Sequence, residues 1–335
     1  MRNSKKIKAE HRWIAGRLLM KRILMVVALI ALAGAGAFAY LGGESGLRKT
    51  IFSLAMPVNY FEPYNARGAS LENVSGPVYS FTYGFSRSMV LDTPEGLAVF
   101  DTFDADFVEK LSAALAKQFP DKSVKWVIYS HNHLDHVRGS DGLGAREFIG
   151  HELVNQFVAD WPRDASGFAP VTRPVTGDVT LSLGGIEVDF LYMPHSHSAT
   201  LYGFHVRGAD VVFAPDMMFV KAFPPFDFPD FYYPGYVRAL DRLIALDAAY
   251  YLPSHLDTGT PKDLIDFRNM TAQFHETVRS ELANNNHNAA DGEAMRRSIK
   301  AAYDKLAPAY GDWHGFNEMF VPKFGRHWGG TYLGY

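Results

Sequence analysis

The sequence predicts an α/β protein in which two groups of β-strands are separated by helices, with a C-terminal helical extension. Short apolar runs bounded by Gly and Pro recur between residues 76 and 258, which is typical of strands and turns. Two amphipathic stretches, 261–287 and 291–306, then follow with helical spacing. The chain has 335 residues, 47% of them apolar, so it can bury one large core or two ordinary ones.

Residues 1–22 are strongly basic, and residues 23–41 carry no charge. The uncharged run is nearly long enough to cross a bilayer, and its basic flank predicts a cytoplasmic N-terminus. We expect a transmembrane anchor, because the basic region is long for a signal peptide. The alternative is a signal peptide cleaved near Ala37-Phe38-Ala39. Either form predicts a periplasmic folded domain, anchored in the inner membrane or secreted.

Residues 42–75 are expected to form a linker, residues 76–260 the main domain, and residues 261–335 C-terminal helices with an aromatic tail. Asp104 can cap a helix in which Phe107, Leu111 and Leu115 share one face. The expected strands are 78–83, 88–91, 97–101, 124–129, 147–150, 179–183, 186–192, 201–206, 211–214 and 250–252. The expected helices are 104–118, 151–160, 234–246, 261–287 and 291–306.

Composition excludes several kinds of site. The net charge is −3 and no basic excess covers the body of the chain, so nucleic acid is not expected as a partner. There is no cysteine, which rules out disulfides, thiol nucleophiles and thiolate metal ligands. Any metal site must therefore use His, Asp, Glu and water.

Residues 130–136 read Ser-His-Asn-His-Leu-Asp-His, and they follow the apolar strand expected at 124–129. Imidazole and carboxylate are ordinary ligands of Zn²⁺ and related cations. Neighbouring residues of a loop point in different directions, so this loop can supply ligands to two metal ions. The alternative is a solvated polar loop that is rich in histidine by chance.

Three later strands also end in residues able to bind a metal. His195 and His197 follow the strand at 186–192, Asp216 follows 211–214, and His255 follows 250–252. Each of these alone is a weak signal, because a polar residue after a strand is usually a cap or a loop residue. Together with the loop 130–136 they make four such places in one chain, and this combination predicts a preorganised metal site.

The motif His131-x-His133-x-Asp135-His136 resembles the H-x-H-x-D-H hallmark of the metallo-β-lactamase-fold hydrolases, and the likeness covers about residues 76–258. It implies a four-layer αβ/βα sandwich and two metal sites. His131, His133 and His197 would hold the first ion, Asp135, His136 and His255 the second, and Asp216 would bridge them. Two zinc ions per chain are expected, with iron and manganese as the alternatives.

This chain departs from the family pattern at two of these positions. The third histidine usually follows a Pro-Gly pair, whereas this chain has Pro194-His195-Ser196-His197. His197 is favoured over His195, because the next strand then begins at the expected distance. Asp216 follows Pro215, where the family usually has Gly.

The chemistry expected is hydrolysis. A metal-bridging hydroxide would cleave an ester, lactone, amide or related bond in a partly apolar small molecule. Asp135 would be the catalytic residue that orients the nucleophile and passes on a proton. The alternatives are a mononuclear iron-dependent sulfur oxygenase, a phosphodiesterase or nuclease, and a membrane-attached binding protein with a vestigial site.

The segment 219–236 is rich in Phe, Tyr and Pro and begins directly after Asp216. It is predicted either to form an apolar wall for the substrate or to pack under the C-terminal helices or against a second subunit. Tyr232, Tyr233 or Tyr236 could offer a hydroxyl to the reacting group. A homo-oligomer is compatible with the sequence, and attachment to a membrane would require that residues 23–41 are retained.

Overall fold

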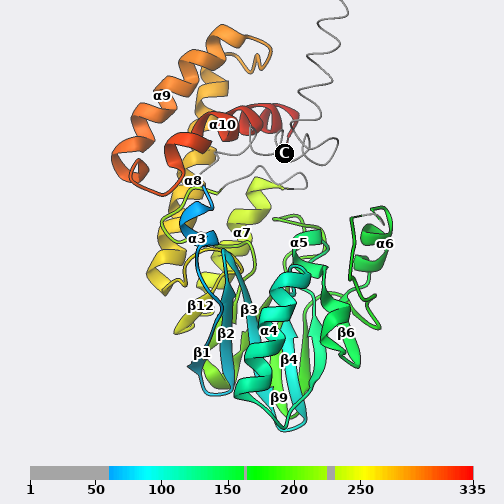
Figure 1. Cartoon of the computed structure of the whole chain (residues 1–335). Helices are drawn as coiled ribbons and strands as arrows, with labels where there is room; N and C mark the ends of the chain where they lie inside the picture. Colours follow the sequence, from blue (N-terminus) through cyan, green and yellow to red (C-terminus); the bar gives the residue numbers. More distant parts are fainter. Residues whose placement is uncertain (1–59, 162–163, 225–230, 335) are drawn as a thin grey trace, which may run out of the picture. The chain divides into compact units, whose positions relative to one another are not determined.

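Two β-sheets packed face to face form the centre of the computed structural model, which describes residues 60–161, 164–224 and 231–334 (Figure 1). These residues belong to one unit that spans Asn59–Tyr335. The first sheet has the strand order β1-β2-β3-β4-β5-β6-β7, with antiparallel pairs up to β4 and parallel pairs after it. Its strands are β1 (Ser70–Ser75), β2 (Val78–Tyr83), β3 (Ser86–Thr93), β4 (Gly96–Phe100), β5 (Val124–Ile128), β6 (Glu147–His151) and β7 (Arg173–Val175).

The second sheet has the order β12-β11-β10-β9-β8 and is antiparallel except for the pair β11 and β12. Its strands are β8 (Val179–Leu183), β9 (Ile186–Tyr192), β10 (Tyr202–Val206), β11 (Val211–Phe213) and β12 (Tyr250–Leu252). The hairpin predicted across Gly184-Gly185 is confirmed as β8 and β9.

Alternation of side chains along the strands sorts them into separate hydrophobic layers. Phe100 of the first sheet meets Phe204 and Phe213 of the second sheet in the core between the sheets. Val212 lies between two β11 residues of that core, and its side chain joins the cluster on the other face of the second sheet. The second sheet is therefore covered on both faces, and a third cluster covers the outer face of the first sheet.

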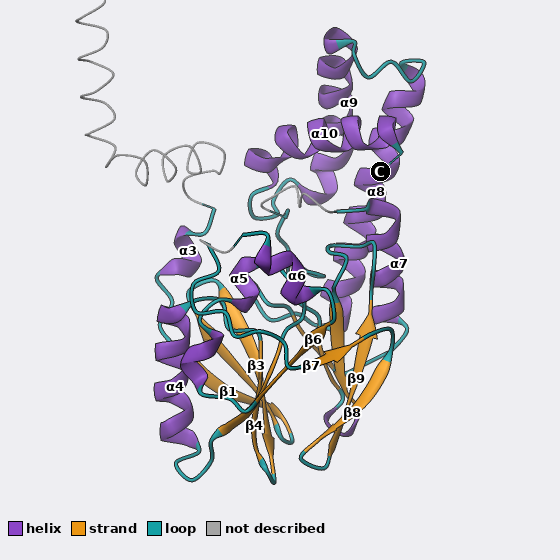
Figure 2. Ribbon diagram, turned by 90° about the vertical axis from the view of Figure 1, so that its right-hand side faces the viewer, coloured by secondary structure: helices purple, strands orange, loops and turns teal. Residues whose placement is uncertain are grey.

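Helices cover the two outer faces and complete four layers (Figure 2). The first sheet is covered by α4 (Ala105–Gln118), whose N-cap Asp104 accepts a hydrogen bond from the Phe107 backbone N–H at 2.9 Å. The second sheet is covered by α7 (Tyr233–Ile244) and α8 (Pro261–Asn284). The predicted αβ/βα sandwich is therefore confirmed.

The C-terminal extension is helical, as predicted, and consists of α8, α9 (Gly292–Tyr310) and α10 (Phe316–Leu333). Thr260 and Asp263 form a reciprocal capping box that fixes the start of α8. The residues expected as an aromatic tail form α10, because Phe316, Phe320, Phe324 and Trp328 recur every four residues and share one buried face.

The folded unit starts earlier than the sequence indicates. Residues 60–75, expected within a linker, include β1 and the helix α3 (Glu62–Asn65). β1 is exposed or half-buried along its whole length, so its residues do not show the alternation of apolar and polar side chains that predicts a strand.

The remaining short helices are α5 (Leu134–Val137), η1 (Ser140–Leu143), α6 (Val154–Ala159) and η2 (Arg207–Ala209).

The prediction of an inner-membrane anchor is corrected here. None of the described helices is both long enough and apolar enough to cross a bilayer. The longest of them, α8, carries charged residues such as Lys262, Asp263 and Asp266. Residues 23–41, on which the prediction of an anchored or exported protein rested, lie outside the described part of the chain.

The beginning of the aromatic segment packs under the C-terminal helices, which was one of its two predicted roles. Phe223 is 1% exposed and lies against the rings of Phe274, Phe316 and Phe320. Phe219 is also buried and contacts Phe267 of α8. Residues 225–230 lie outside the described residues.

We expect the substitution Phe223→Ala to lower the free energy of unfolding by about 3–5 kcal/mol, because it leaves a cavity among three aromatic rings. The control is Val321→Ala on the outer face of α10, where the side chain is 54% exposed and a change within about 0.5 kcal/mol is expected. Chemical denaturation measures both. Equal effects of the two substitutions would contradict this packing.

Candidate metal centre

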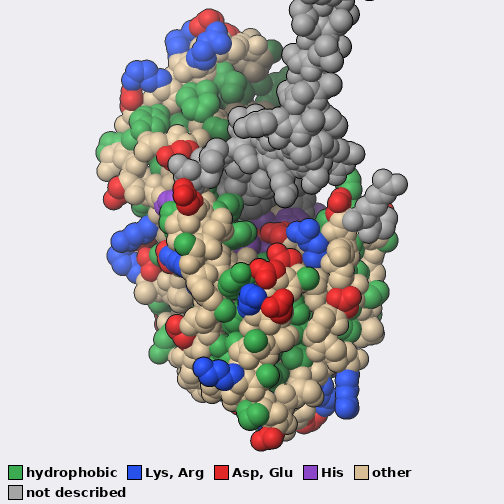
Figure 3. All heavy atoms as spheres, viewed as in Figure 1, with side chains coloured by type: hydrophobic (Ala, Val, Ile, Leu, Met, Phe, Trp, Pro, Cys, Tyr) green, Lys and Arg blue, Asp and Glu red, His purple; other side chains and the backbone are tan. Residues whose placement is uncertain are grey.

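The residues able to bind a metal lie where strands of both sheets end. The loop 130–136 follows β5, the loop 193–199 follows β9, and Asp216 and His255 follow β11 and β12. Because β9, β11 and β12 run in the same direction, their last residues lie at one edge of the second sheet. Histidine and acidic side chains also come together near the middle of the face drawn in Figure 3.

The structure brings the predicted residues into two groups whose potential ligand atoms lie within 4.8 Å of one another. The first group contains His131, His133, His197 and Asp216, and the second contains Asp135, His136 and His255. Among the described residues, His197 belongs to a group and His195 does not. The geometry therefore favours His197, as the sequence did.

Asp216 lies between the two groups. Its Oδ2 is 3.0 Å from His197 Nε2, 3.4 Å from His131 Nε2 and 3.2 Å from His136 Nε2. Its Oδ1 is 3.2 Å from His255 Nε2. One buried carboxylate thus faces histidines of both groups.

Asp101, which was not selected from the sequence, orients the loop 130–136 through hydrogen bonds to two of its residues. Its Oδ2 accepts hydrogen bonds from the Ser130 hydroxyl at 2.7 Å and from His136 Nδ1 at 2.9 Å. Its Oδ1 accepts one from the Ser130 backbone N–H at 2.8 Å. This arrangement leaves Nε2 of His136 facing Asp216. The available signal was that Asp101 ends an apolar strand, as Asp216 does.

Polar side chains also join the central loop to the loop that carries His197. Asn132 Oδ1 accepts hydrogen bonds from the hydroxyls of Ser198 and Thr200, both at 2.8 Å. The Asn132 backbone N–H donates to Thr200 Oγ1 at 2.9 Å. In the neighbouring loop, Ser254 Oγ donates to Asp216 Oδ1 at 2.7 Å. These bonds fix the ligand loops relative to one another.

Arg87 of β3 holds the loop that carries His255, and it too was missed. Its guanidinium donates to the carbonyl oxygens of Pro253 at 2.8 Å and Leu256 at 3.0 Å. Its backbone N–H donates to the Ser254 carbonyl at 2.7 Å. Arg87 is 3% exposed, and burial lowers the pKa of its guanidinium to about 10. A buried arginine therefore bonds on both sides of His255.

The electrostatics of the cluster suit a cation. Burial alone would raise the pKa of Asp216, but His136 and His255 hold it well below its ordinary value. Burial also lowers the pKa of His255, and it lowers that of His131 strongly, which favours neutral imidazoles. Burial opposes protonation of His136, yet Asp216, Asp135 and Asp101 raise its pKa well above the ordinary value. A bound cation would displace that proton.

The backbone is strained at the same places. Asp101, His195, Asp216 and Leu256 all adopt positive φ angles of 50° to 62°, which are uncommon for residues other than glycine. Each of them lies in or beside a loop that carries a candidate ligand or its hydrogen-bond partner. Such strain is held by surrounding contacts and is concentrated at functional sites.

The donor set fits divalent metal ions. It consists of five imidazoles and two carboxylates, which are ligands typical of zinc and of neighbouring transition metals. His131 Nε2 is buried and makes no hydrogen bond. His136 Nε2 and His255 Nε2 approach to 3.3 Å, a contact that needs a cation or a proton between the two nitrogens.

Comparison with known proteins agrees with this geometry. Residues 82–255, more than half of the chain, match the family described as Metallo-beta-lactamase superfamily. The chain belongs to this superfamily. The match and the group of His and Asp side chains together identify a metal-dependent, hydrolase-like fold. The match ends at residue 255, before α8, so the C-terminal helices lie beyond the matched region.

Two curated relatives come from Nocardioides sp. (strain JS1661). The chain is 29% identical over 189 residues to the alpha subunit of 2,4-dinitroanisole O-demethylase, covering 55% of this chain and 56% of that protein. It is 24% identical over 208 residues to the beta subunit, covering 60% and 64%. The chain therefore spans a little over half of the length of these relatives.

Two solved structures show the same fold. The metallo-beta-lactamase from Pontibacter korlensis has a TM-score of 0.54 at 18% identity, covering 61% of this chain and 99% of that chain. The metallo-beta-lactamase from Hirschia baltica has a TM-score of 0.52 at 17% identity, covering 61% and 98%. At these identities the likeness concerns the fold alone.

The tyrosines proposed to reach the reacting group are distinguished by their contacts. The buried Tyr236 hydroxyl donates to the Asp216 backbone carbonyl at 2.7 Å, so it is engaged in holding that loop. Tyr233 is buried with its ring against His275 and His327. Tyr232 lines a cavity of about 740 Å³ together with His195.

We expect Arg87→Met to weaken binding of the metal ion at Asp135, His136 and His255 by about 10–100-fold, because the loop carrying His255 loses its support. The control is Arg173→Met, which removes a partly exposed ion pair with Glu147 of β6 instead. Competition with a chromophoric chelator measures the affinity of each ion. Equal affinities in the two variants would show that Arg87 does not position His255.

Proposed function

We propose that this protein is a hydrolase that uses two divalent metal ions, zinc in the first instance, to cleave an ester, lactone, amide or related bond in a partly apolar small molecule. The observation that carries the proposal is the position of Asp216. Its two carboxylate oxygens lie 3.0–3.4 Å from histidine nitrogens of both groups. A carboxylate shared in this way supports a dinuclear site.

In this proposal His131, His133 and His197 hold one ion, and Asp135, His136 and His255 hold the other. When bound, the ion pair supplies an acidified water and stabilises negative charge on the substrate. Asp101 keeps His136 in the tautomer whose Nε2 faces the site, through the 2.9 Å hydrogen bond to Nδ1. Ser254 holds the Asp216 carboxylate through Oδ1.

Asp135 is proposed as the catalytic residue. Its side chain is 56% exposed, whereas those of His136 and Asp216 are buried. It lies 3.7 Å from His136 Nε2 and 3.8 Å from His255 Nε2. A carboxylate at the open side of the site can orient the attacking water and pass its proton to the leaving group.

The group formed by Asp135, His136 and His255 helps to choose among the alternative functions. A mononuclear iron-dependent sulfur oxygenase needs one ion, whereas here Asp135, His136 and His255 form a second group beside the first. A phosphodiesterase can use the same two ions, so it stays an alternative that substrate tests decide.

A second candidate function is suggested by the two curated relatives, which are named as subunits of an enzyme that O-demethylates 2,4-dinitroanisole. We therefore include activated aryl methyl ethers, which water would split into a phenol and methanol, among the substrates to test. Association with a second, related subunit is proposed on the same ground.

We expect the zinc-loaded protein to hold about two ions per chain and Asp216→Ala to hold fewer than one after dialysis, because both groups lose their shared carboxylate. The control is Asp178→Asn, which changes an exposed carboxylate paired with Arg242. Plasma mass spectrometry measures the metal. Two ions retained by Asp216→Ala would refute the bridging role.

We expect a hydrolysis panel of lactones, aryl esters, β-lactams, phosphodiesters, thioesters and activated aryl methyl ethers to reveal turnover by the zinc-loaded protein. Asp135→Ala should then lower kcat by about 10²–10⁴-fold, because proton transfer loses its carboxylate. Asp121→Ala, an exposed aspartate in the turn before β5, is the control. Full activity of Asp135→Ala would contradict the mechanism.

A further inference from the structure

We propose that the first turn of α7 positions two candidate metal ligands at once, because it holds the backbone of Asp216 and also seats the loop that carries His197. These two residues follow β11 and β9, which lie on either side of β10 in the second sheet. Their side chains nevertheless approach to 3.0 Å, from His197 Nε2 to Asp216 Oδ2. The inference rests on the proposed two-metal function and adds positioning residues to that site.

Tyr236 of α7 bonds directly to the backbone of Asp216. Its hydroxyl donates to the Asp216 carbonyl oxygen at 2.7 Å, and the residue is 1% exposed. Asp216 adopts a positive φ of 56°, and its backbone N–H donates to Ser254 Oγ at 3.1 Å. The peptide groups on both sides of the Asp216 Cα are therefore held by side chains from distant elements. Because a strained residue keeps its conformation only while such contacts persist, Tyr236 is a positioning residue for this carboxylate.

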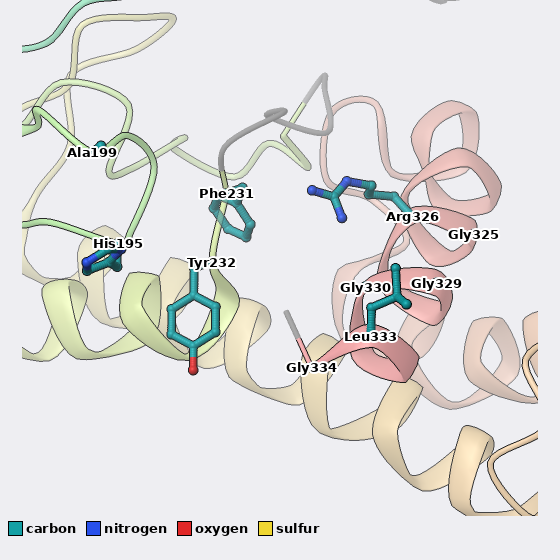
Figure 4. Close-up of a pocket in the computed structure, with 10 residues that line it drawn as sticks. All are labelled: His195, Ala199, Phe231, Tyr232, Gly325, Arg326, Gly329, Gly330, Leu333 and Gly334. Atoms are coloured by element: carbon teal, nitrogen blue, oxygen red, sulfur yellow. The ribbon is translucent and has the colours of Figure 1, made fainter.

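The same turn of α7 contacts the loop that carries His197. The Tyr232 backbone N–H donates at 2.9 Å to the carbonyl oxygen of Ser196, the residue before His197. A Cβ added at Gly235 would lie 1.7 Å from the His195 carbonyl oxygen, so the loop rests on the helix backbone. Figure 4 shows His195 beside α7, with Tyr232 at the start of the helix. The position of the His197 loop is therefore set by this turn.

The sequence of α7 carries a sign of this contact. Gly235 is the third residue of the helix and does not adopt a positive φ, so its conformation does not require glycine. Glycine is unfavourable inside a helix, because its backbone loses more freedom on folding than that of any other residue. The close approach of the His195 carbonyl oxygen supplies the reason for a glycine here, since any side chain would push the loop away.

Contacts further along α7 fix the helix itself. Arg242, near its other end, donates at 2.8 Å to the carbonyl oxygen of Tyr192, the last residue of β9. The ring of Tyr236 packs against Phe267 of α8, with the ring centroids 6.4 Å apart. The helix is thus anchored to the strand that leads to His197, and α8 supports it from outside. The C-terminal extension therefore bears on the metal groups, although the described residues of α8 supply none of their members.

The two contacts predict different effects on the metal ions. Asp216 faces histidines of both groups, so a displaced Asp216 affects both ions. We expect Tyr236→Phe to weaken binding of each ion by about 10–100-fold. The loop beside Gly235 supplies His197 to the first group alone. Gly235→Ala should therefore weaken mainly the ion of the first group, and by a similar factor.

Each variant has a matched control. Tyr60→Phe also removes a buried hydroxyl that donates to a backbone carbonyl, that of Phe223 at 2.8 Å. Gly329→Ala also adds a methyl group inside a helix, at a position of α10 where a Cβ meets nothing within 4 Å. Both controls should bind the two ions as the wild type does. Chemical denaturation checks that all four variants are folded, and Tyr236→Phe alone decides the test if Gly235→Ala does not fold.

The first readout is the affinity for each zinc ion, measured on the whole protein by competition with a chromophoric chelator. The second is the visible absorption spectrum of the protein with Co²⁺ in place of Zn²⁺, which reports the geometry of the ligands. Tyr236→Phe should change both, whereas a residue with a merely structural role would change the stability and leave the spectrum intact. A wild-type spectrum and wild-type affinities in folded Tyr236→Phe would overturn the inference.

Neither readout uses a substrate, so the inference and the proposed function can fail separately. Weakened metal binding in Tyr236→Phe, combined with no hydrolysis of any substrate in the panel by the wild type, would support the inference and overturn the proposed function. Hydrolysis by the wild type, combined with unchanged metal binding in Tyr236→Phe, would overturn the inference and leave the proposed function in place.

Discussion

The rest of the site depends on one buried carboxylate. Asp216 is 4% exposed, and its two oxygens face histidines from three different loops. Burying a carboxylate among imidazoles is costly unless partners satisfy it. Ser254 supplies one such partner, and Asp101 supports His136 from the other side. The two sheets bring these loops together because their strands end at the same place.

The two sheets and the C-terminal helices contribute differently. The sheets position every candidate ligand, and all strands from β3 to β12 lie within the residues that match the superfamily. The helices cover the second sheet and bring α10 to the cavity lined by His195. Tyr236 connects the two parts, since its ring packs with the helices and its hydroxyl holds the Asp216 loop.

Much of the fold and site could be predicted from local patterns. The H-x-H-x-D-H loop and the later strand ends located all seven residues that the structure groups. Asp101 and Arg87 were missed because their roles depend on partners distant in sequence, such as the Pro253 carbonyl for Arg87. β1 was missed because it is partly exposed, and the position of the aromatic segment depended on helices that follow it. The membrane anchor was inferred from an uncharged run and its basic flank, and no described helix supports it.

We propose that one carboxylate, that of Asp216, joins two metal ions. Anomalous X-ray scattering from crystals of the zinc-loaded protein tests it most directly. We expect two peaks about 3.5–4 Å apart, one beside His131 and His197 and one beside His136 and His255, with Asp216 between them. A single peak at one group, or two peaks that Asp216 does not contact, would contradict it.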